Sequence, residues 1–182
     1  MDRLLICGAR ILDPSNGTDE TGDILITDGM ISAVGGKIRC EGDAVTDAQG
    51  LIAAPGLVDM HVHLRDPGFT EKEDIFTGCR AAAAGGVTSL LCMPNTNPAA
   101  DSPETVRYIR EKAAKADARV YVAAAITKGL KSEELNDLAA LRDAGAIALS
   151  DDGRPVVNTL LMAQAMRLAC ALRLKVGSHC ED

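Results

Sequence analysis

The stretch LVDMHVHLRDPG, residues 57–68, runs from an apolar strand directly into two histidines, an arginine and an aspartate. Side chains two residues apart in a strand point to the same face, so His61 and His63 are expected to project together, with Asp59 below them. Two imidazoles on one face at a strand end can chelate Zn²⁺ or a similar ion, and an ordinary polar strand end is the alternative interpretation. The residues between them are expected to face covering helices: Val58, Met60 and Val62.

After residue 56 the sequence alternates between apolar strands and helices. Strands are expected at 57–63, 87–94, 118–127, 146–152 and 174–180. Helices are expected at 70–86, 102–116, 132–145 and 158–173. Strands that are apolar on both faces and alternate with helices predict a parallel sheet covered by helices.

Capping residues support three of these helix starts. Thr70 with Glu73 matches a capping box. Ser102 is expected as an N-cap followed by Pro103 at the first helical position, and Asn158 as the N-cap of the last helix.

Residues 1–54 have a different texture, which predicts a small all-β domain. Short β-rich runs are separated by turn residues, including the dipeptide Asp28-Gly29 that favours a hairpin. We place the domain boundary after residue 54, with residues 55–182 forming the α/β part.

Polar residues gather where the predicted strands end. Asp151 and Asp152 close the fourth strand and His179 the fifth, and the chain has only three histidines. Strand ends of this kind carry the active sites of (β/α)₈ TIM-type barrels, which favours a barrel over an open doubly wound sheet. In a barrel the three segments would aim His61, His63, an aspartate and His179 into one mouth.

The number of strands is too small for a complete barrel. A (β/α)₈ barrel takes about 250 residues and eight strands, whereas this chain of 182 residues offers five candidate strands after residue 56. We therefore expect a barrel truncated after about five strands, in the N-terminal part of a longer protein. An exposed sheet edge predicts aggregation or pairing with another copy, which leaves a homodimer open.

Charge and composition exclude several classes of protein. The formal net charge of −7 offers no electrostatic footprint for nucleic acid or an anionic membrane. There is no apolar run long enough for a membrane span and no visible secretory signal. Six cysteines without a CxxC pair predict free thiols in a reducing cytoplasm.

Four motifs together resemble one enzyme family: GLVDMHVHLRDPG, MPNTNP, SDDG and HCED. They are similar to the signatures of the dihydroorotases within the amidohydrolase superfamily. The resemblance covers essentially the whole chain, because the first 54 residues resemble the N-terminal part of that family's composite β sandwich.

The resemblance implies a metal centre of one or two Zn²⁺ ions. His61 and His63 match the ligands of the more buried metal, and His179 matches a ligand of the second. Many superfamily members bridge the ions with a carboxylated lysine, but here the fourth strand offers only aspartates. We expect Asp152 to bridge, with Asp151 as the second choice.

The resemblance also implies a reaction and the residues that hold its substrate. The family catalyses reversible hydrolysis of (S)-dihydroorotate to N-carbamoyl-L-aspartate in pyrimidine biosynthesis. Arg65 and Asn95, with His63, match its substrate-binding residues, and a guanidinium suits a carboxylate. The family's general acid/base aspartate and a further histidine ligand would lie beyond residue 182. No catalytic acid or base is therefore expected in this chain, which alone should be inactive.

Two other functions stay open. A hydantoinase- or allantoinase-type cyclic amidase shares the paired histidines, but the missing lysine and the presence of Arg65 argue against it. A non-catalytic scaffold for aspartate transcarbamoylase is the second, although all four expected metal ligands are present.

Three further features receive predictions. Asp66 is expected to shape the loop after the first strand, with a place near the metals as the alternative. Cys180 and Glu181 follow His179, where contact with the site is one interpretation, and packing is expected for the thiol. Thr127 closes the third strand near the mouth without an assigned task.

Overall fold

The computed structural model describes residues 2–39 and 44–180, so Cys40 and Glu181 lie outside the described residues. The chain divides into two compact units, Met1–Pro55 and Gly56–Asp182, which we call the β unit and the parallel unit. Each is described by itself below. In the described part of the chain, no helix is long and apolar enough to cross a membrane.

The β unit is one five-stranded sheet with the order β3-β2-β1-β4, in which β5 also pairs with β1. Its strands are β1 (Arg3–Asp13), β2 (Thr18–Thr27), β3 (Met30–Val34), β4 (Ala44–Asp47) and β5 (Ile52–Ala53). The β1–β2 and β2–β3 pairs are antiparallel, whereas β4 and β5 run parallel to β1. Asp28 and Gly29 both have positive φ between β2 and β3, as a tight hairpin turn requires.

The buried Asp23 accepts backbone hydrogen bonds where the register of the β1–β2 pair shifts. The β1–β2 register shifts between Ile6 and Ala9, where Gly8 has a φ of 72°. Asp23 accepts hydrogen bonds from the backbone N–H groups of Ile38 and Gly8, each at 2.9 Å. These bonds from Ile38 and Gly8 lower the pKa of the Asp23 carboxyl. Asp23 therefore binds a backbone amide at the point where the β1–β2 register shifts.

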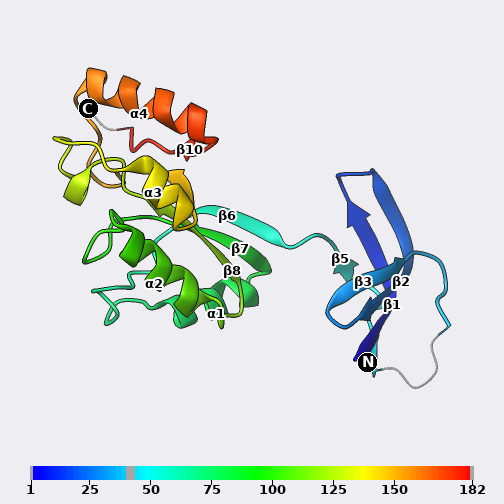
Figure 1. Cartoon of the computed structure of the whole chain (residues 1–182). Coiled ribbons are helices and arrows are strands. Elements are labelled where there is room, and N and C mark those ends of the chain that lie inside the picture. The colour runs from blue at the N-terminus through cyan, green and yellow to red at the C-terminus, as the bar shows by residue number, and fades with distance from the viewer. Residues whose placement is uncertain (1, 40–43, 181–182) are drawn as a thin grey trace. The chain divides into compact units, whose positions relative to one another are not determined.

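The parallel unit has five parallel strands in the order β10-β9-β8-β7-β6, so that every strand lies next to its neighbour in the sequence. The strands are β6 (Leu57–Val62), β7 (Val87–Cys92), β8 (Arg119–Ala124), β9 (Ala146–Leu149) and β10 (Lys175–Val176). The helices are α1 (Ile75–Ala84), α2 (Pro103–Ala113), the 3₁₀ turn η1 (Lys128–Leu130), α3 (Leu138–Asp143) and α4 (Thr159–Leu172). Each α-helix packs against the strand that follows it, and consecutive α-helices pack against each other, as Figure 1 shows.

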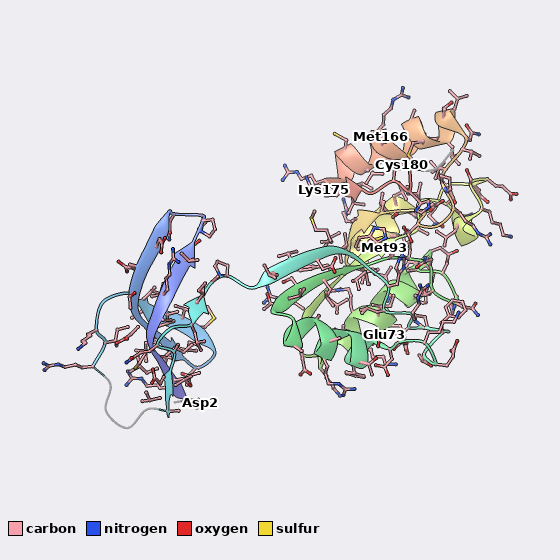
Figure 2. All side chains as sticks on the ribbon, turned by 180° about the vertical axis from the view of Figure 1, so that it is seen from behind. Asp2, Glu73, Met93, Met166, Lys175 and Cys180 are labelled. Atoms are coloured by element: carbon pink, nitrogen blue, oxygen red, sulfur yellow. The ribbon has the colours of Figure 1, made fainter. Side chains whose placement is uncertain are left out.

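The strands of this sheet bury different residues on their two faces. Val122 and Ala124 of β8 join the large core beneath the helices, together with helix residues such as Ile109 and Leu141. Ala123, between them, belongs to a smaller cluster on the other face. That cluster contains Met93, Ala123 and Ala148, with Leu91 packed against it, and Met93 is labelled inside the parallel unit in Figure 2. Alternation along the strands thus separates a helix-covered face from an inner face.

Two helix predictions need correction at their starts. The capping box at Thr70 and Glu73 was wrong, because α1 begins at Ile75 with Asp74 as its N-cap. Asp74 accepts from the Thr77 N–H at 2.8 Å, and the Thr77 hydroxyl accepts from the Asp74 N–H at 3.0 Å. The preceding residues form a turn instead, closed by a hydrogen bond from the Phe69 N–H to the Arg65 carbonyl.

The predicted helix over 132–145 is confined to Leu138–Asp143. Its first part is bound to the end of β8 instead. Leu135 forms an antiparallel bridge with Thr127, and the Asn136 side chain donates to the Ala125 carbonyl at 2.9 Å. Ser132 has a φ of 58°, which a continuous helix does not allow.

Two predictions about exposure were also wrong. Val62 of β6 packs against the large core, but Val58 and Met60 are 64% and 74% exposed instead of covered by helices. Cys180 is exposed, whereas packing was expected. The free-thiol prediction is confirmed for the five cysteines that the structure describes: Cys7, Cys79, Cys92, Cys170 and Cys180.

Candidate metal centre

His61 and His63 meet Asp152 at the carboxyl ends of β6 and β9. The Nε2 atom of His61 lies 3.1 Å from Asp152 Oδ1, and that of His63 lies 3.5 Å from Asp152 Oδ2. One donor atom from each of the three residues falls within 4.8 Å of the other two. Two ring nitrogens and a carboxylate oxygen are donors that Zn²⁺ accepts.

His179 approaches the same carboxylate from the segment after β10. Its Nδ1 atom lies 3.6 Å from Asp152 Oδ1. The four residues predicted as metal ligands therefore come together in space, from three strand ends that are far apart in the sequence.

Asn95 fixes the orientation of the His63 ring. Its Nδ2 group donates to Asp152 Oδ2 at 3.1 Å, and its Oδ1 atom lies 2.9 Å from His63 Nδ1. A carboxylate can only accept, so the amide oxygen faces the ring, and Nδ1 of His63 must carry the hydrogen. In a neutral ring the Nε2 lone pair then faces the Asp152 carboxylate. Two acceptors that face each other fit a cation bound between them.

Asp151 and Asp152 point to different surroundings, although they are adjacent. Asp152 is 5% exposed and faces the histidines, whereas Asp151 is 2% exposed and faces the end of β8. Oδ1 of Asp151 accepts from the backbone N–H groups of Ile126 at 2.7 Å and Thr127 at 3.1 Å. Its Oδ2 atom accepts a hydrogen bond from the Thr127 hydroxyl. Burial raises the pKa of the Asp151 carboxyl against these hydrogen bonds.

Asp66 lies against α2, on side chains that the sequence analysis did not single out. It is 1% exposed, and its carboxylate contacts Lys112 Nζ at 2.7 Å and accepts from the Tyr108 hydroxyl at 3.0 Å. The hydrogen bond from Lys112 to Asp66 raises the pKa of the ammonium group. Tyr108 and Lys112 lie four residues apart, so the sequence predicts that they share one face of α2. The sequence of α2 does not show that Asp66 is their partner.

Arg65 follows the paired histidines in the sequence and directly precedes Asp66. It is half-buried, and its φ of 59° turns the chain sharply after β6. Gly68 follows with a φ of 96°, and a Cβ atom there would lie 2.0 Å from the Asn97 carbonyl oxygen. The Asn97 N–H donates to the Pro67 carbonyl at 3.0 Å, so the loops after β6 and β7 are in direct contact.

An open cavity of about 520 Å³ adjoins the cluster in the parallel unit. Asn95 and Asp152 line it together with Phe69, Leu130 and Arg154. The site thus combines a cluster of candidate metal ligands with room for a small molecule.

The comparisons with known proteins agree on one family. The family model described as dihydro-orotase-like matches residues 50–182. The chain is 52% identical over 182 residues to a dihydroorotase of Ruminiclostridium cellulolyticum, covering 99% of this chain and 42% of that protein. It is 51% identical over 181 residues to a dihydroorotase of Citrifermentans bemidjiense, covering 98% and 43%. The chain thus spans less than half of the length of these curated relatives.

Solved structures agree on the fold. L-hydantoinase (dihydropyrimidinase) from Arthrobacter aurescens superposes with a TM-score of 0.84 at 22% identity, over 100% of this chain and 41% of that one. A dihydropyrimidinase from Brevibacillus agri gives a TM-score of 0.78 at 24% identity, over 99% and 40%. These matches and the strand order confirm the predicted class, the first five strands of a TIM-type barrel preceded by a β unit.

Proposed function

The chain belongs to the dihydro-orotase-like family, and from that membership we propose that the whole protein is a dihydroorotase. It would interconvert (S)-dihydroorotate and N-carbamoyl-L-aspartate in pyrimidine biosynthesis. The observation that carries the proposal is the meeting of His61, His63 and Asp152 within a chain about half identical to curated dihydroorotases.

We propose that His61, His63, Asp152 and His179 hold one or two Zn²⁺ ions, with Asp152 shared when two are present. Asp152 contacts all three histidines, whereas the Asp151 carboxylate is bound by Ile126 and Thr127, which supports Asp152 as the shared ligand. Bound zinc supplies a Lewis acid for a carbonyl and lowers the pKa of water toward neutrality. The chain's part is to present unprotonated ring nitrogens, and the contact of Asn95 with His63 Nδ1 does so for one ring.

We propose that Arg65, Asn95 and His63 orient the substrate. The carboxylate of dihydroorotate matches the planar guanidinium fork of Arg65, which can donate two parallel hydrogen bonds. Asn95 lines the cavity and also touches His63 and Asp152, so a ligand that binds its amide is brought beside the metal ligands. Holding the substrate in one orientation lowers the entropic part of the barrier. Proton transfer is assigned to no residue of this chain.

Domain organisation, location and partners follow as proposals from the same membership. We propose that residues 1–54 form part of a composite β sandwich and that the protein is cytoplasmic, which its free thiols support. A homodimer and an aspartate transcarbamoylase partner stay predictions.

The test is a comparison of substrates with the full-length protein. Hydrolysis of dihydroorotate is expected, with hydantoin and allantoin much poorer. Hydrolysis of hydantoin or allantoin alone would instead favour the cyclic amidase, which the likeness to an L-hydantoinase structure keeps as the second candidate.

Arg65→Lys sharpens this test, because it keeps the charge but loses the fork. The KM for dihydroorotate should rise about tenfold, the size of one lost charge-assisted hydrogen bond. Slow turnover of dihydrouracil, which lacks the carboxylate, should not change. An equal effect on both substrates would remove Arg65 from the carboxylate site.

A further inference from the structure

The β8–β9 pairing ends before the candidate metal centre begins. The last paired residues are Ala124 and Leu149, followed by one hydrogen bond from the Ser150 N–H to the Ala124 carbonyl at 2.9 Å. The Ala125 N–H donates to the Ala100 carbonyl, and the N–H groups of Ile126 and Thr127 after it are bound by the Asp151 side chain. A carboxylate thus continues the connection that the backbone ladder no longer makes.

Thr127, which binds the Asp151 carboxylate, is itself fixed by a further hydrogen bond. Thr127 is fully buried, and its hydroxyl donates to Asp151 while it accepts from the Ser132 N–H at 3.0 Å. The hydroxyl can therefore not turn toward another acceptor without breaking its hydrogen bond to Asp151 Oδ2 or the one from the Ser132 N–H. Ser132 also accepts from the Val157 N–H at 3.0 Å, which ties the loop after β9 to the same point.

We propose that Asp151 and Thr127 are positioning residues of the metal centre: they fix the end of β9 so that Asp152 faces the histidines. The inference rests on the proposed metal site and assigns a task to two residues that do not contact the ion. Asp152 is one peptide unit from Asp151, so a rotation of this backbone would carry its carboxylate away from His61 and His63. Preorganised ligands bind a metal more tightly because their ordering is complete before the ion arrives.

The decisive variant is Asp151→Asn, which keeps the shape of the side chain. Its carbonyl oxygen can still accept from the Ile126 and Thr127 N–H groups, but its NH₂ group cannot accept from the Thr127 hydroxyl. We expect the Zn²⁺ affinity of the full-length protein, measured by competition with a chelator, to fall by about 10- to 100-fold, the usual effect of residues that orient metal ligands. Unchanged affinity in a folded protein would overturn the proposal.

Thr127 gives an independent test that does not touch the metal ligands or their neighbours in sequence. Thr127→Val keeps the shape and removes the hydroxyl, so the affinity should fall in the same direction as in Asp151→Asn. Thr127→Ser restores the hydroxyl and should restore the affinity. If Asp151→Asn fails to fold, this pair decides: equal affinities for valine and serine would contradict the positioning role.

Arg110→Met is the matched control for a loss of stability. Arg110 donates to the Ala144 carbonyl at 2.9 Å, just before the opposite end of the same strand β9. The variant should lower the melting temperature and leave Zn²⁺ affinity unchanged. A fall in affinity with Arg110→Met as large as with Asp151→Asn would show that general destabilisation explains both, and would overturn the inference.

Asp152→Ala separates this inference from the proposed function. Zinc retained by Asp152→Ala would mean that the proposed site is wrong. Zinc lost by Asp152→Ala but bound with normal affinity by Asp151→Asn and Thr127→Val would leave the site in place and reject only the positioning role.

Discussion

The β unit and the parallel unit each contain a buried aspartate that accepts hydrogen bonds from two backbone amides. Asp23 binds Ile38 and Gly8, and these bonds lower the pKa of its carboxyl. Asp151 binds Ile126 and Thr127, yet its pKa is raised, because the cost of burying the charge exceeds what the hydrogen bonds return. The same local pattern therefore gives opposite shifts.

This difference shows that the hydrogen-bond partners of a buried carboxylate do not by themselves reveal its role in the protein. Asp23 lies beside a register shift in an antiparallel pair and satisfies a backbone amide there. Asp151 lies where parallel strands end, next to a residue that faces three histidines. The task follows from the position in the fold, because the carboxyl ends of parallel strands converge and the positions within an antiparallel pair do not.

The largest expected effect comes from comparing Asp152→Ala with Asp23→Ala in the full-length protein. Asp152→Ala removes the oxygen atoms that the three histidines face, so bound zinc and hydrolysis should each fall by at least about 100-fold, more than the loss of an orienting residue costs. Asp23→Ala should keep its zinc, because its hydrogen-bond partners lie in the β unit. Elemental analysis after dialysis measures the zinc content of both variants. Zinc loss in Asp23→Ala would contradict the prediction that only the aspartate of the parallel unit affects zinc binding.

Lys112→Met tests the third buried aspartate, Asp66, whose charge is matched by a cation. The variant leaves a carboxylate that is 1% exposed with only neutral partners, so unfolding should become easier by about 3 kcal/mol. Lys115→Met, on an exposed side chain close by, serves as the control and should change stability little. Urea unfolding measures both variants, and similar midpoints would show that the Asp66–Lys112 pair contributes no stability.

Ser102→Ala asks whether stability in the parallel unit can be lowered without touching the site. Ser102 caps α2 by accepting from the Thr105 N–H at 3.3 Å. Its loss should cost about 1 kcal/mol of unfolding free energy, with zinc affinity unchanged. Ser102→Thr, which keeps the oxygen, should recover most of that loss. A change in zinc affinity would show that helix starts and metal ligands are coupled in this unit.

The smallest expected effect is confined to two amides of the β unit. The folded-state pKa of Asp23 lies below its ordinary value of 3.8, so its hydrogen bonds stabilise the unit fully above that pH and are lost as the pH falls through the lowered pKa. Hydrogen exchange at Gly8 and Ile38 should lose protection there. The Ala48 amide donates to a backbone carbonyl, so it is the control and should show no such loss. Asp23→Asn should remove the pH dependence.

Much of the fold could be predicted from local sequence. Ser102 and Asn158 cap helices where expected, since each stands directly before an apolar helical period. Thr70 was predicted to cap the first helix, but Asp74 does so. The start of this helix depends on the turn that the Phe69 N–H and the Arg65 carbonyl close, which the capping pattern alone does not show. Residues 132–137 have helical composition but bind the end of β8, a contact between segments that no local pattern contains.

The sequence predicted that the side chains of the candidate site would lie together at the strand ends, but not how the two adjacent aspartates differ. Convergence of strand ends brought His61, His63 and His179 to one aspartate, as expected from a barrel. The sequence could not decide between Asp151 and Asp152, because their directions depend on how the backbone turns after the last ladder bond at Ser150. Lys112 went unnoticed for a similar reason: its partner Asp66 is 46 positions away in the chain.

Gly68 has a consequence for anyone who wishes to redesign the selectivity of this protein. Its missing side chain lets the turn after β6 rest directly on the Asn97 carbonyl, and Pro67 and Asn97 are hydrogen-bonded. Arg65 and Asn95 therefore sit on one composite block made of two segments. A segment grafted alone from a homologue would not fit the contact between Gly68 and Asn97. Chimaeras should therefore exchange both segments together.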